Sequence, residues 1–110
     1  GRGLMAETTV KLSKSYTAHE KTFDAVTLRE PTFSEIFRDG LGRPSDWQPT
    51  QHGPMLVKYP EVVDAYLRRI CVSPGYESIG ALNAIDSLKL EEAVADFFRE
   101  KTESPKSPTD

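Results

Sequence analysis

The stretch Val26-Thr27-Leu28-Arg29-Glu30-Pro31-Thr32-Phe33-Ser34-Glu35-Ile36 marks a change from strand to helix. The residues up to Leu28 suit a half-buried strand. Pro31 ends that strand, because proline donates no hydrogen bond and keeps the preceding residue out of helical backbone. Thr32 and Glu35 have the spacing of a capping box, in which each side chain accepts from the other residue's backbone N–H. We therefore expect strands before Pro31 and helices after it.

Two strands are predicted before this junction. Residues 8–13 alternate, with Val10 and Leu12 on one face, and residues 22–29 alternate in the same way. The two segments are close in sequence, so we expect an antiparallel hairpin. Because a two-stranded hairpin is marginally stable alone, helices must cover one of its faces.

Helices are predicted at about 33–39, 60–71 and 87–101, with one or two helical turns within 76–82. Gly40 suits the end of the first helix, Pro60 the start of the second, and Asp86 or Ser87 the N-cap of the third. Residues 41–58 contain three prolines and show no period, which predicts a long irregular loop. The expected fold class is α+β: an N-terminal two-stranded antiparallel hairpin packed on three to four helices.

Composition predicts one domain, at residues 8–101. Residues 1–7 are interpreted as a disordered N-terminus or expression scar, and residues 102–110 as a disordered polar tail. The net charge of -3 and the pI near 5.4 argue against a nucleic-acid partner. No long apolar run or signal peptide is visible, which predicts a cytoplasmic protein with no membrane partner. The single cysteine, Cys71, excludes an internal disulfide framework.

The sequence contains no catalytic constellation, so we predict a protein that is not an enzyme. His19 and His52 stand far apart without other ligands at metal-binding spacing, and neither a metal nor a cofactor is expected. Cys71 continues the apolar stripe of the second helix, which predicts a buried, unreactive thiol. The aromatic pairs Phe33/Phe37 and Phe97–Phe98 are interpreted as core residues.

Four residues are candidates for binding a partner. Trp47, the only tryptophan, either pins the 41–58 loop to the domain or contacts a partner, because tryptophan is enriched at binding hot spots. Arg68 and Arg69 form either a solvated helix face or a partner contact. Arg29, at the end of the second strand, is the fourth candidate.

The tripeptide Asp86-Ser87-Leu88 offers a different interpretation. Asp-Ser-Leu at the start of a helix carries the phosphopantetheine group in acyl carrier proteins, which would make Ser87 a modified site. A helix N-cap at Asp86 or Ser87 explains the same residues.

The order of elements and two motifs resemble the tail assembly chaperones of long-tailed phages, of the Mu-like type found in many prophages. The motifs are Leu28-Arg29-Glu30-Pro31-Thr32 and the spaced pattern Leu90-x-x-Ala93-Val94-x-x-Phe97-Phe98. The resemblance covers most of residues 8–100. The sequence departs from the family in lacking a glycine near Glu20 and in the length of the 41–58 segment.

The resemblance implies a non-enzymatic assembly role. A chaperone of this family binds the tape measure protein, keeps it soluble and helps to recruit tail tube subunits, and a ribosomal frameshift often produces a longer form. It also implies a homo-oligomer, located in the cytoplasm of the host bacterium and absent from the mature virion. The alternatives are an acyl-carrier-like domain modified at Ser87 and a small non-enzymatic adaptor protein.

Overall fold

The structure is a computed structural model that describes residues 6–99. Its elements, in chain order, are β1 (Glu7–Ala18), β2 (Lys21–Arg29), the helical turn η1 (Ser34–Arg38), β3 (Ser45–Thr50), β4 (Gly53–Lys58), α1 (Pro60–Ile70), β5 (Cys71–Ser73), the 3₁₀ turn η2 (Tyr76–Ser78) and α2 (Ala84–Asp96).

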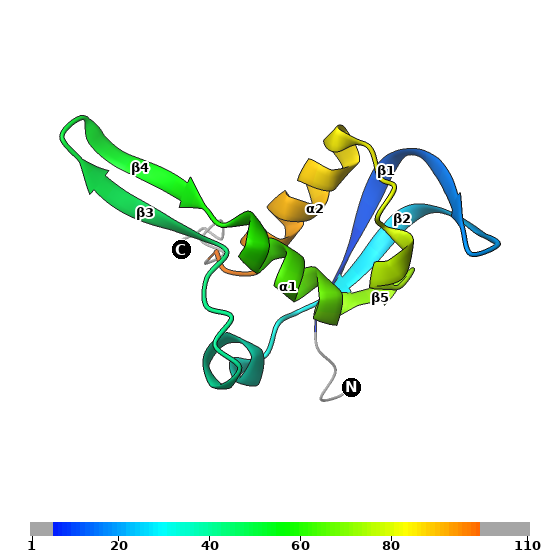
Figure 1. Ribbon diagram of the computed structural model, residues 1–110, viewed down its shortest axis with the longest axis horizontal. Helices are drawn as coiled ribbons and strands as arrows, with labels where there is room; N and C mark the ends of the chain where they lie inside the picture. The colour runs from blue at the N-terminus through cyan, green and yellow to red at the C-terminus, as the bar shows by residue number, and fades with distance from the viewer. Residues whose placement is uncertain (1–5, 100–110) are drawn as a thin grey trace, which may run out of the picture.

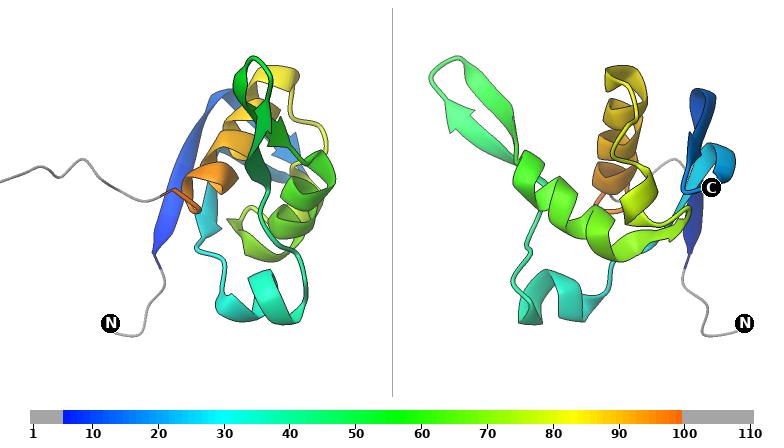
Figure 2. Two further views of the ribbon diagram at one scale, coloured as in Figure 1. Left: turned by 90° about the vertical axis from the view of Figure 1, so that its left-hand side faces the viewer. Right: turned by 45° about the vertical axis from the view of Figure 1, so that its right-hand side comes forward.

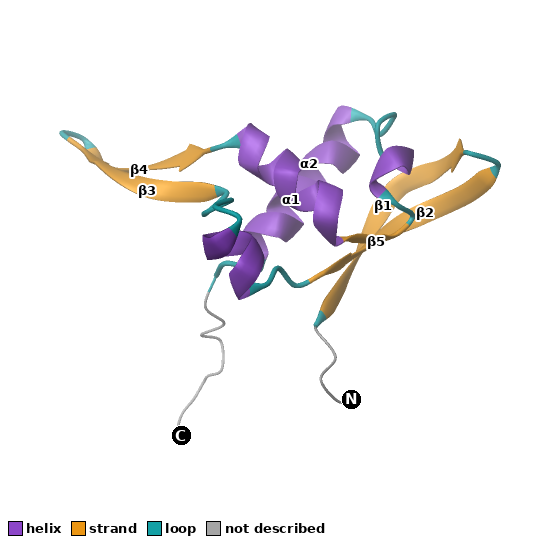
Figure 3. Cartoon of the chain, turned by 60° about the horizontal axis from the view of Figure 1, so that its bottom comes forward, coloured by secondary structure: helices purple, strands orange, loops and turns teal. Residues whose placement is uncertain are grey.

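Two antiparallel sheets lie on opposite sides of the helices (Figures 1 and 3). The first has three strands in the order β1–β2–β5, and helices α1 and α2 pack against it. The second is the two-stranded ribbon β3–β4, which projects away from the helices (Figure 2). The buried apolar residues come from β1, β2, α1 and α2: Leu12, Val26, Leu28, Val63, Tyr66, Leu67, Ile70, Leu90, Ala93 and Val94.

The predicted fold class is wrong, because five strands in two sheets replace the expected hairpin on three to four helices. The error lies mainly in residues 41–58, of which 45–58 form the β3–β4 hairpin. Its turn is stabilised by Thr50, whose hydroxyl donates to the carbonyl of Gly53 and accepts from the N–H of His52 at 3.1 Å. Gly53 has a φ of 109°, which glycine adopts without strain. Residues 41–58 thus form a hairpin although their sequence shows no hydrophobic period, and Thr50 and Gly53 stabilise its turn.

The antiparallel hairpin before Pro31 is confirmed, but it is longer than predicted. β1 pairs with β2 from Glu7 opposite Arg29 to Ala18 opposite Lys21, so Glu7 belongs to a strand and not to a disordered N-terminus. Residues 1–5 and 100–110, and the predictions made for them, lie outside the described residues. Where a glycine was expected, His19 and Glu20 form the turn with φ values of 52° and 65°. Two consecutive residues of positive φ match the twist of a tight hairpin.

The helix predictions differ in accuracy. α1 begins at Pro60 as predicted, whereas Cys71 is not helical and instead starts β5, which pairs with β2. α2 begins before the predicted position: Asn83 is its N-cap, with a side-chain oxygen that accepts from the N–H of Asp86 at 2.8 Å. Gly40 ends the first helical segment with the predicted positive φ, 77°.

The predicted capping box forms, and it is joined by an ion pair. The N–H of Glu35 donates to the Thr32 hydroxyl at 3.2 Å, and the N–H of Thr32 donates to the Glu35 carboxylate at 3.0 Å. Arg29 then holds both oxygens of the same buried carboxylate, at 3.1 and 2.6 Å. The Arg29 hydrogen bonds lower the pKa of Glu35 below its ordinary value of 4.5, against the opposing effect of burial. The junction between β2 and η1 is therefore fixed by three residues.

We expect Arg29→Met to lower the free energy of unfolding by about 3 kcal/mol at pH 7, because it leaves a buried carboxylate without its partner. A carboxylate whose pKa is lower in the folded state than in the unfolded state stabilises the fold at pH values above its unfolded-state pKa. This contribution is lost as the pH falls through the folded-state pKa. The difference between wild type and variant should therefore shrink on acidification from pH 6 to below the ordinary pKa of about 4.5. Urea unfolding at several pH values measures this.

The matched control is Arg68→Met. Arg68 pairs with Asp64 at 3.1 Å on the surface, where both side chains are largely solvated. Such pairs contribute about 0–1 kcal/mol. Equal losses in the two variants would contradict a special role for the Arg29–Glu35 pair.

Candidate functional site

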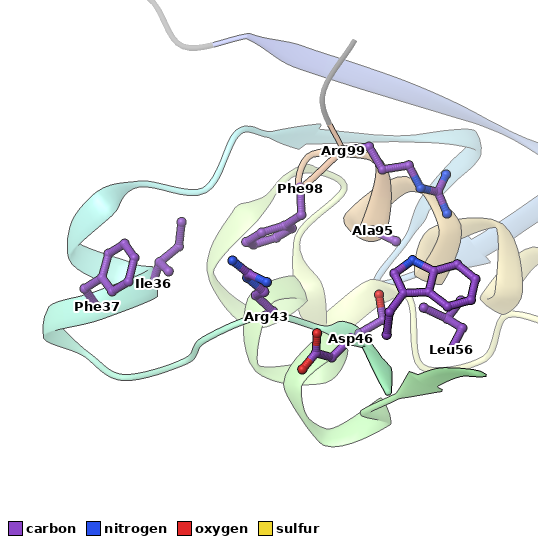
Figure 4. Close-up of a pocket in the computed structure, with 10 residues that line it drawn as sticks. Ile36, Phe37, Arg43, Asp46, Leu56, Ala95, Phe98 and Arg99 are labelled. Atoms are coloured by element: carbon purple, nitrogen blue, oxygen red, sulfur yellow. The ribbon is translucent and has the colours of Figure 1, made fainter. Parts of the chain in front are cut away.

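An open groove of about 460 Å³ lies between η1, the β3–β4 ribbon and the C-terminal end of α2 (Figure 4). Its lining side chains are mostly apolar, with a few charged groups among them: Ile36, Phe37, Arg43, Ser45, Asp46, Trp47, Leu56, Ala95, Phe98 and Arg99. These residues come from segments that are far apart in sequence, and they meet where the base of the ribbon lies near η1 and the C-terminal end of α2. A groove of this volume has room for a few large side chains of a partner.

The β3–β4 ribbon has one apolar face, which borders the groove. Trp47 is opposite Leu56 and Pro49 is opposite Pro54. Residues opposite one another in an antiparallel pair share a face, and so do residues two apart in a strand. We call these four residues the apolar ribbon face. Within it the Trp47 side chain is 64% exposed, so much of this surface has no covering layer among residues 6–99.

Strand addition is disfavoured near the tip of the ribbon. Pro49 and Pro54 stand directly opposite each other, and neither has an N–H to give to the other strand. They therefore occupy a non-hydrogen-bonded pair, whose backbone groups point outward, and the donor is missing on both edges. Proline at strand edges is a common protection against pairing with another strand. Near the tip, the faces of the ribbon and not its edges are thus the surface available to a partner.

Two aromatic side chains extend the apolar surface beyond the ribbon. Phe33 and Phe37 pack on each other with ring centroids 5.0 Å apart, and they are 64% and 66% exposed. The prediction that this pair belongs to the core is therefore wrong, because the short turn η1 presents both rings to solvent. Phe97 and Phe98, predicted as core, are partly buried and pack against it.

The groove is lined by charged groups of both signs, Arg43, Asp46 and Arg99, and Asp46 forms no ion pair within residues 6–99. Arg43 and the neighbouring Arg38 form no ion pair within the described part of the chain, although Arg38 lies 5.7 Å from the centre of the Phe33 ring. Arg99 is neutralised by Glu92, at 2.8 Å, and by Asp96. Figure 4 shows Arg43 and Asp46 on the ribbon side of the groove, across from the end of α2.

Of the four predicted partner-binding residues, Trp47 alone lines the groove. Arg29 holds Glu35 and also donates to the backbone carbonyl of Arg69 at 3.1 Å. Arg69 itself pairs with Asp39. Arg68 pairs with Asp64 and lies 5.0 Å from the centre of the Tyr76 ring. Internal contacts thus account for the three arginines.

Sequence reasoning missed the charged and apolar partners of Trp47. Arg43 and Leu56 lie within the segment predicted as an irregular loop, and Ile36 lies within the helix predicted at about 33–39, with no role in binding assigned to it. The signal that was available is the alternation Trp47-x-Pro49 and Pro54-x-Leu56, which places four apolar residues on one face once a hairpin is assumed.

The proposed carrier serine lies beside a buried structural carboxylate. Asp86 is fully buried and accepts hydrogen bonds from the N–H and hydroxyl of Ser13, both at 2.9 Å, and from the Tyr16 hydroxyl at 2.6 Å. Burial alone would raise the pKa of Asp86, but these hydrogen bonds outweigh it and the pKa lies below its ordinary value. Ser87 is exposed and its hydroxyl lies 3.4 Å from the carbonyl of Leu82. Asp86 thus serves to join α2 to β1.

The two histidines and the cysteine do not come together in one site. His19 and His52 lie in the turns of different hairpins, and in residues 6–99 no three His, Cys, Asp or Glu side chains form a group that could hold a metal ion. Cys71 is half-buried, and burial raises the pKa of its thiol to about 11. Little thiolate is therefore present at neutral pH.

A scan against protein-family models, a search of curated proteins and a search of solved structures each give no match. Within residues 6–99, the helices are too short or too polar to cross a membrane. The function is therefore inferred from the groove, the apolar ribbon face and the sequence motifs.

Proposed function

We propose that this protein is a phage tail assembly chaperone that binds the tape measure protein and keeps it soluble. The observation that carries the proposal is the groove together with the apolar ribbon face, a contiguous apolar surface on a small domain. Exposed apolar surface of this kind marks binding sites for other proteins. A long helical protein that is insoluble alone would be protected by covering its apolar stripe with many copies of such a surface.

The sequence motifs support the same proposal from a different direction. Leu28, Leu90 and Val94 of the two motifs lie in the buried core, and Arg29 and Thr32 form the junction with Glu35. The residues of the motifs thus build the core of this domain and the junction between β2 and η1. The groove residues supply the binding surface, and recruitment of tail tube subunits is a further role that the resemblance implies.

The proposal is tested by co-expression with the large, helix-rich protein encoded just downstream. We expect the large protein to become soluble and to purify with several copies of this chain per copy of the partner, since repeated weak contacts along one chain gain avidity. Mass photometry or light scattering gives the ratio of the two proteins. The proposal fails if the large protein stays insoluble, or if this chain stays monomeric and does not bind it.

A further inference from the structure

The groove lies at the point where the described residues give way to the segment 100–110. Phe98 and Arg99 line the groove, and the segment continues directly from them (Figure 4). Pro105 is six residues from Arg99, and six residues span up to about 20 Å when extended. This length is more than enough to cross a groove of about 460 Å³, so residues 105–108 of the same chain have Trp47 within reach.

The segment contains a sequence pattern that fits a groove lined by aromatic rings. Residues 105–108 read Pro-Lys-Ser-Pro. A polyproline II helix has three residues per turn, so the two prolines of a P-x-x-P sequence lie on one face of it. Such sequences bind aromatic-lined grooves, because the helix is favoured before binding and loses little entropy. The groove supplies the rings of Phe37, Trp47 and Phe98.

The charges of the groove have both signs, and so do those of the segment. Arg43 and Asp46 line the groove and form no ion pair within residues 6–99, although Asp46 accepts a hydrogen bond from the Gln48 amide at 3.2 Å. The segment carries Glu103 two residues before its first proline and Lys106 directly after it. A ligand of one sign sets a like charge against one of the groove residues, whereas this segment offers an opposite charge to each.

We propose that residues 103–108 bind in the groove of their own molecule, with Pro105 and Pro108 against the ring of Trp47. The short connection from Arg99 keeps the segment at a high effective concentration, of order mM, so contacts too weak to hold a free peptide suffice. The bound segment supplies the layer that the largely exposed Trp47 side chain lacks among residues 6–99.

The ion pairs follow from the order of residues in the two strands of contact. Asp46 is next to Trp47 in β3, and Lys106 is next to Pro105, so a proline on the indole ring brings the lysine near the carboxylate. Arg43 lies closer to η1 and pairs with the glutamate that precedes the prolines.

The bound segment covers the apolar surface of the free chain, and it leaves when another protein binds there. This consequence deepens the proposed function and rests on it, since the other protein is then the tape measure protein. Covering an exposed apolar surface also limits aggregation of the chain before it meets that protein.

The test places a spin label on the segment and reads the NMR signal of the Trp47 indole N–H, which is unique because the chain has one tryptophan. The label is attached to Ser107→Cys, and Cys71→Ala removes the other thiol. We expect the label to broaden the Trp47 signal in dilute protein, and reduction of the label to restore it. The amide of His19, in the turn of the other sheet, should stay sharp (Figure 1). Unchanged amide shifts elsewhere show that the labelled chain is folded.

Substitutions in the segment separate the two kinds of contact. Pro105→Ser together with Pro108→Ser should abolish the broadening. Lys106→Glu should lower the ratio of bound to free segment about five-fold, the size of one exposed ion pair, and adding Asp46→Lys should restore it. The matched control is Lys101→Glu, which makes the same change in charge before the motif and should leave the broadening unchanged.

The inference is overturned if the Trp47 signal stays sharp in the labelled chain, or if the double proline variant broadens it equally. A second copy of this chain is the competing source of the segment. To detect it, a chain enriched in ¹⁵N without spin label is mixed with a spin-labelled chain of natural isotopes. Broadening of the Trp47 signal in this mixture would assign the groove to the segment of another copy and overturn binding within one molecule.

The spin-label and co-expression experiments can fail separately. If the label broadens the Trp47 signal and the large downstream protein stays insoluble, the groove holds its own segment and the chaperone role falls. If the large protein is solubilised and the Trp47 signal stays sharp, the chaperone role stands and the inference about the segment falls.

Discussion

Asp86→Ala is expected to lower the melting temperature by roughly 15 °C, a large effect for a domain of this size. The fully buried Asp86 carboxylate accepts three hydrogen bonds from Ser13 and Tyr16. Removing it deletes three hydrogen bonds to a charged acceptor, from the N–H and hydroxyl of Ser13 and the hydroxyl of Tyr16, and each such bond is stabilising. Thermal unfolding followed by circular dichroism measures the change.

The size of the effect follows from where these residues lie in the chain. Ser13 and Tyr16 belong to β1, and Asp86 belongs to α2, so the contact closes the domain between its first and last elements. The Tyr16 hydroxyl also accepts from the N–H of Asn83 at 3.2 Å, which joins the same cluster to the N-cap of α2. Loss of Asp86 therefore loosens both the start of α2 and its attachment to the sheet.

The control variant is Ser87→Ala, the adjacent exposed residue. We expect its melting temperature to stay within about 2 °C of wild type, as is usual for surface substitutions. Asp86→Asn should give an intermediate loss, because an amide keeps the shape and one acceptor. A wild-type melting temperature for Asp86→Ala would show that the cluster contributes nothing. Incubation with a phosphopantetheinyl transferase, with intact mass as readout, tests the carrier alternative on the same proteins.

The second large effect is expected on binding. Under the proposed function, Trp47→Gln should weaken the complex with the proposed partner, the tape measure protein, about thirty-fold or more, the range of hot-spot tryptophans, and should return that partner to the insoluble fraction. The side chain is largely exposed and outside the buried core, so the melting temperature of the isolated chain should change little. The yield of soluble complex and the melting temperature are measured on the same preparations.

Met55→Gln is the matched control for this substitution. Met55 lies opposite Gln48, on the other face of the same ribbon, and is 52% exposed. The two variants thus remove a comparable apolar group from the two faces of one ribbon. Equal loss of binding in both would place the contact elsewhere, or would indicate that the ribbon as a whole was disrupted.

The core of the domain was largely predictable, because its signals are local. Alternation in the first two strands placed Leu12, Val26 and Leu28 on buried faces, and helical spacing did the same for Val63 and Leu90. The β3–β4 ribbon could not be predicted in this way. Its prolines remove backbone donors, a property that argues against a strand until Pro49 and Pro54 are known to be opposite each other. β5 has three residues and forms through its pairing with β2.

The candidate site was predicted at only one position. Trp47 was selected because tryptophan is enriched at binding sites, an argument that does not depend on where the residue lies in the fold. Arg29, Arg68 and Arg69 were also selected by residue type. In the structure they pair with carboxylates of their own chain, as Arg29 does with Glu35. Arg43 carries no sequence signal that distinguishes it, because its place in the groove depends on how the fold brings η1, the ribbon and α2 together.

The ribbon has a consequence for the release of a bound protein. Among residues 6–99, β3 and β4 pair only with each other. A lone antiparallel pair is marginally stable in water, so the amide protons of the ribbon should exchange quickly in the free chain. A partner that covers Trp47 orders these strands, and the lost conformational entropy opposes binding. Affinity is therefore lower than the area of contact suggests, and amide exchange that slows on binding reports this loss. In the proposed chaperone role, a competing subunit would then need only a modest advantage in affinity to displace each copy.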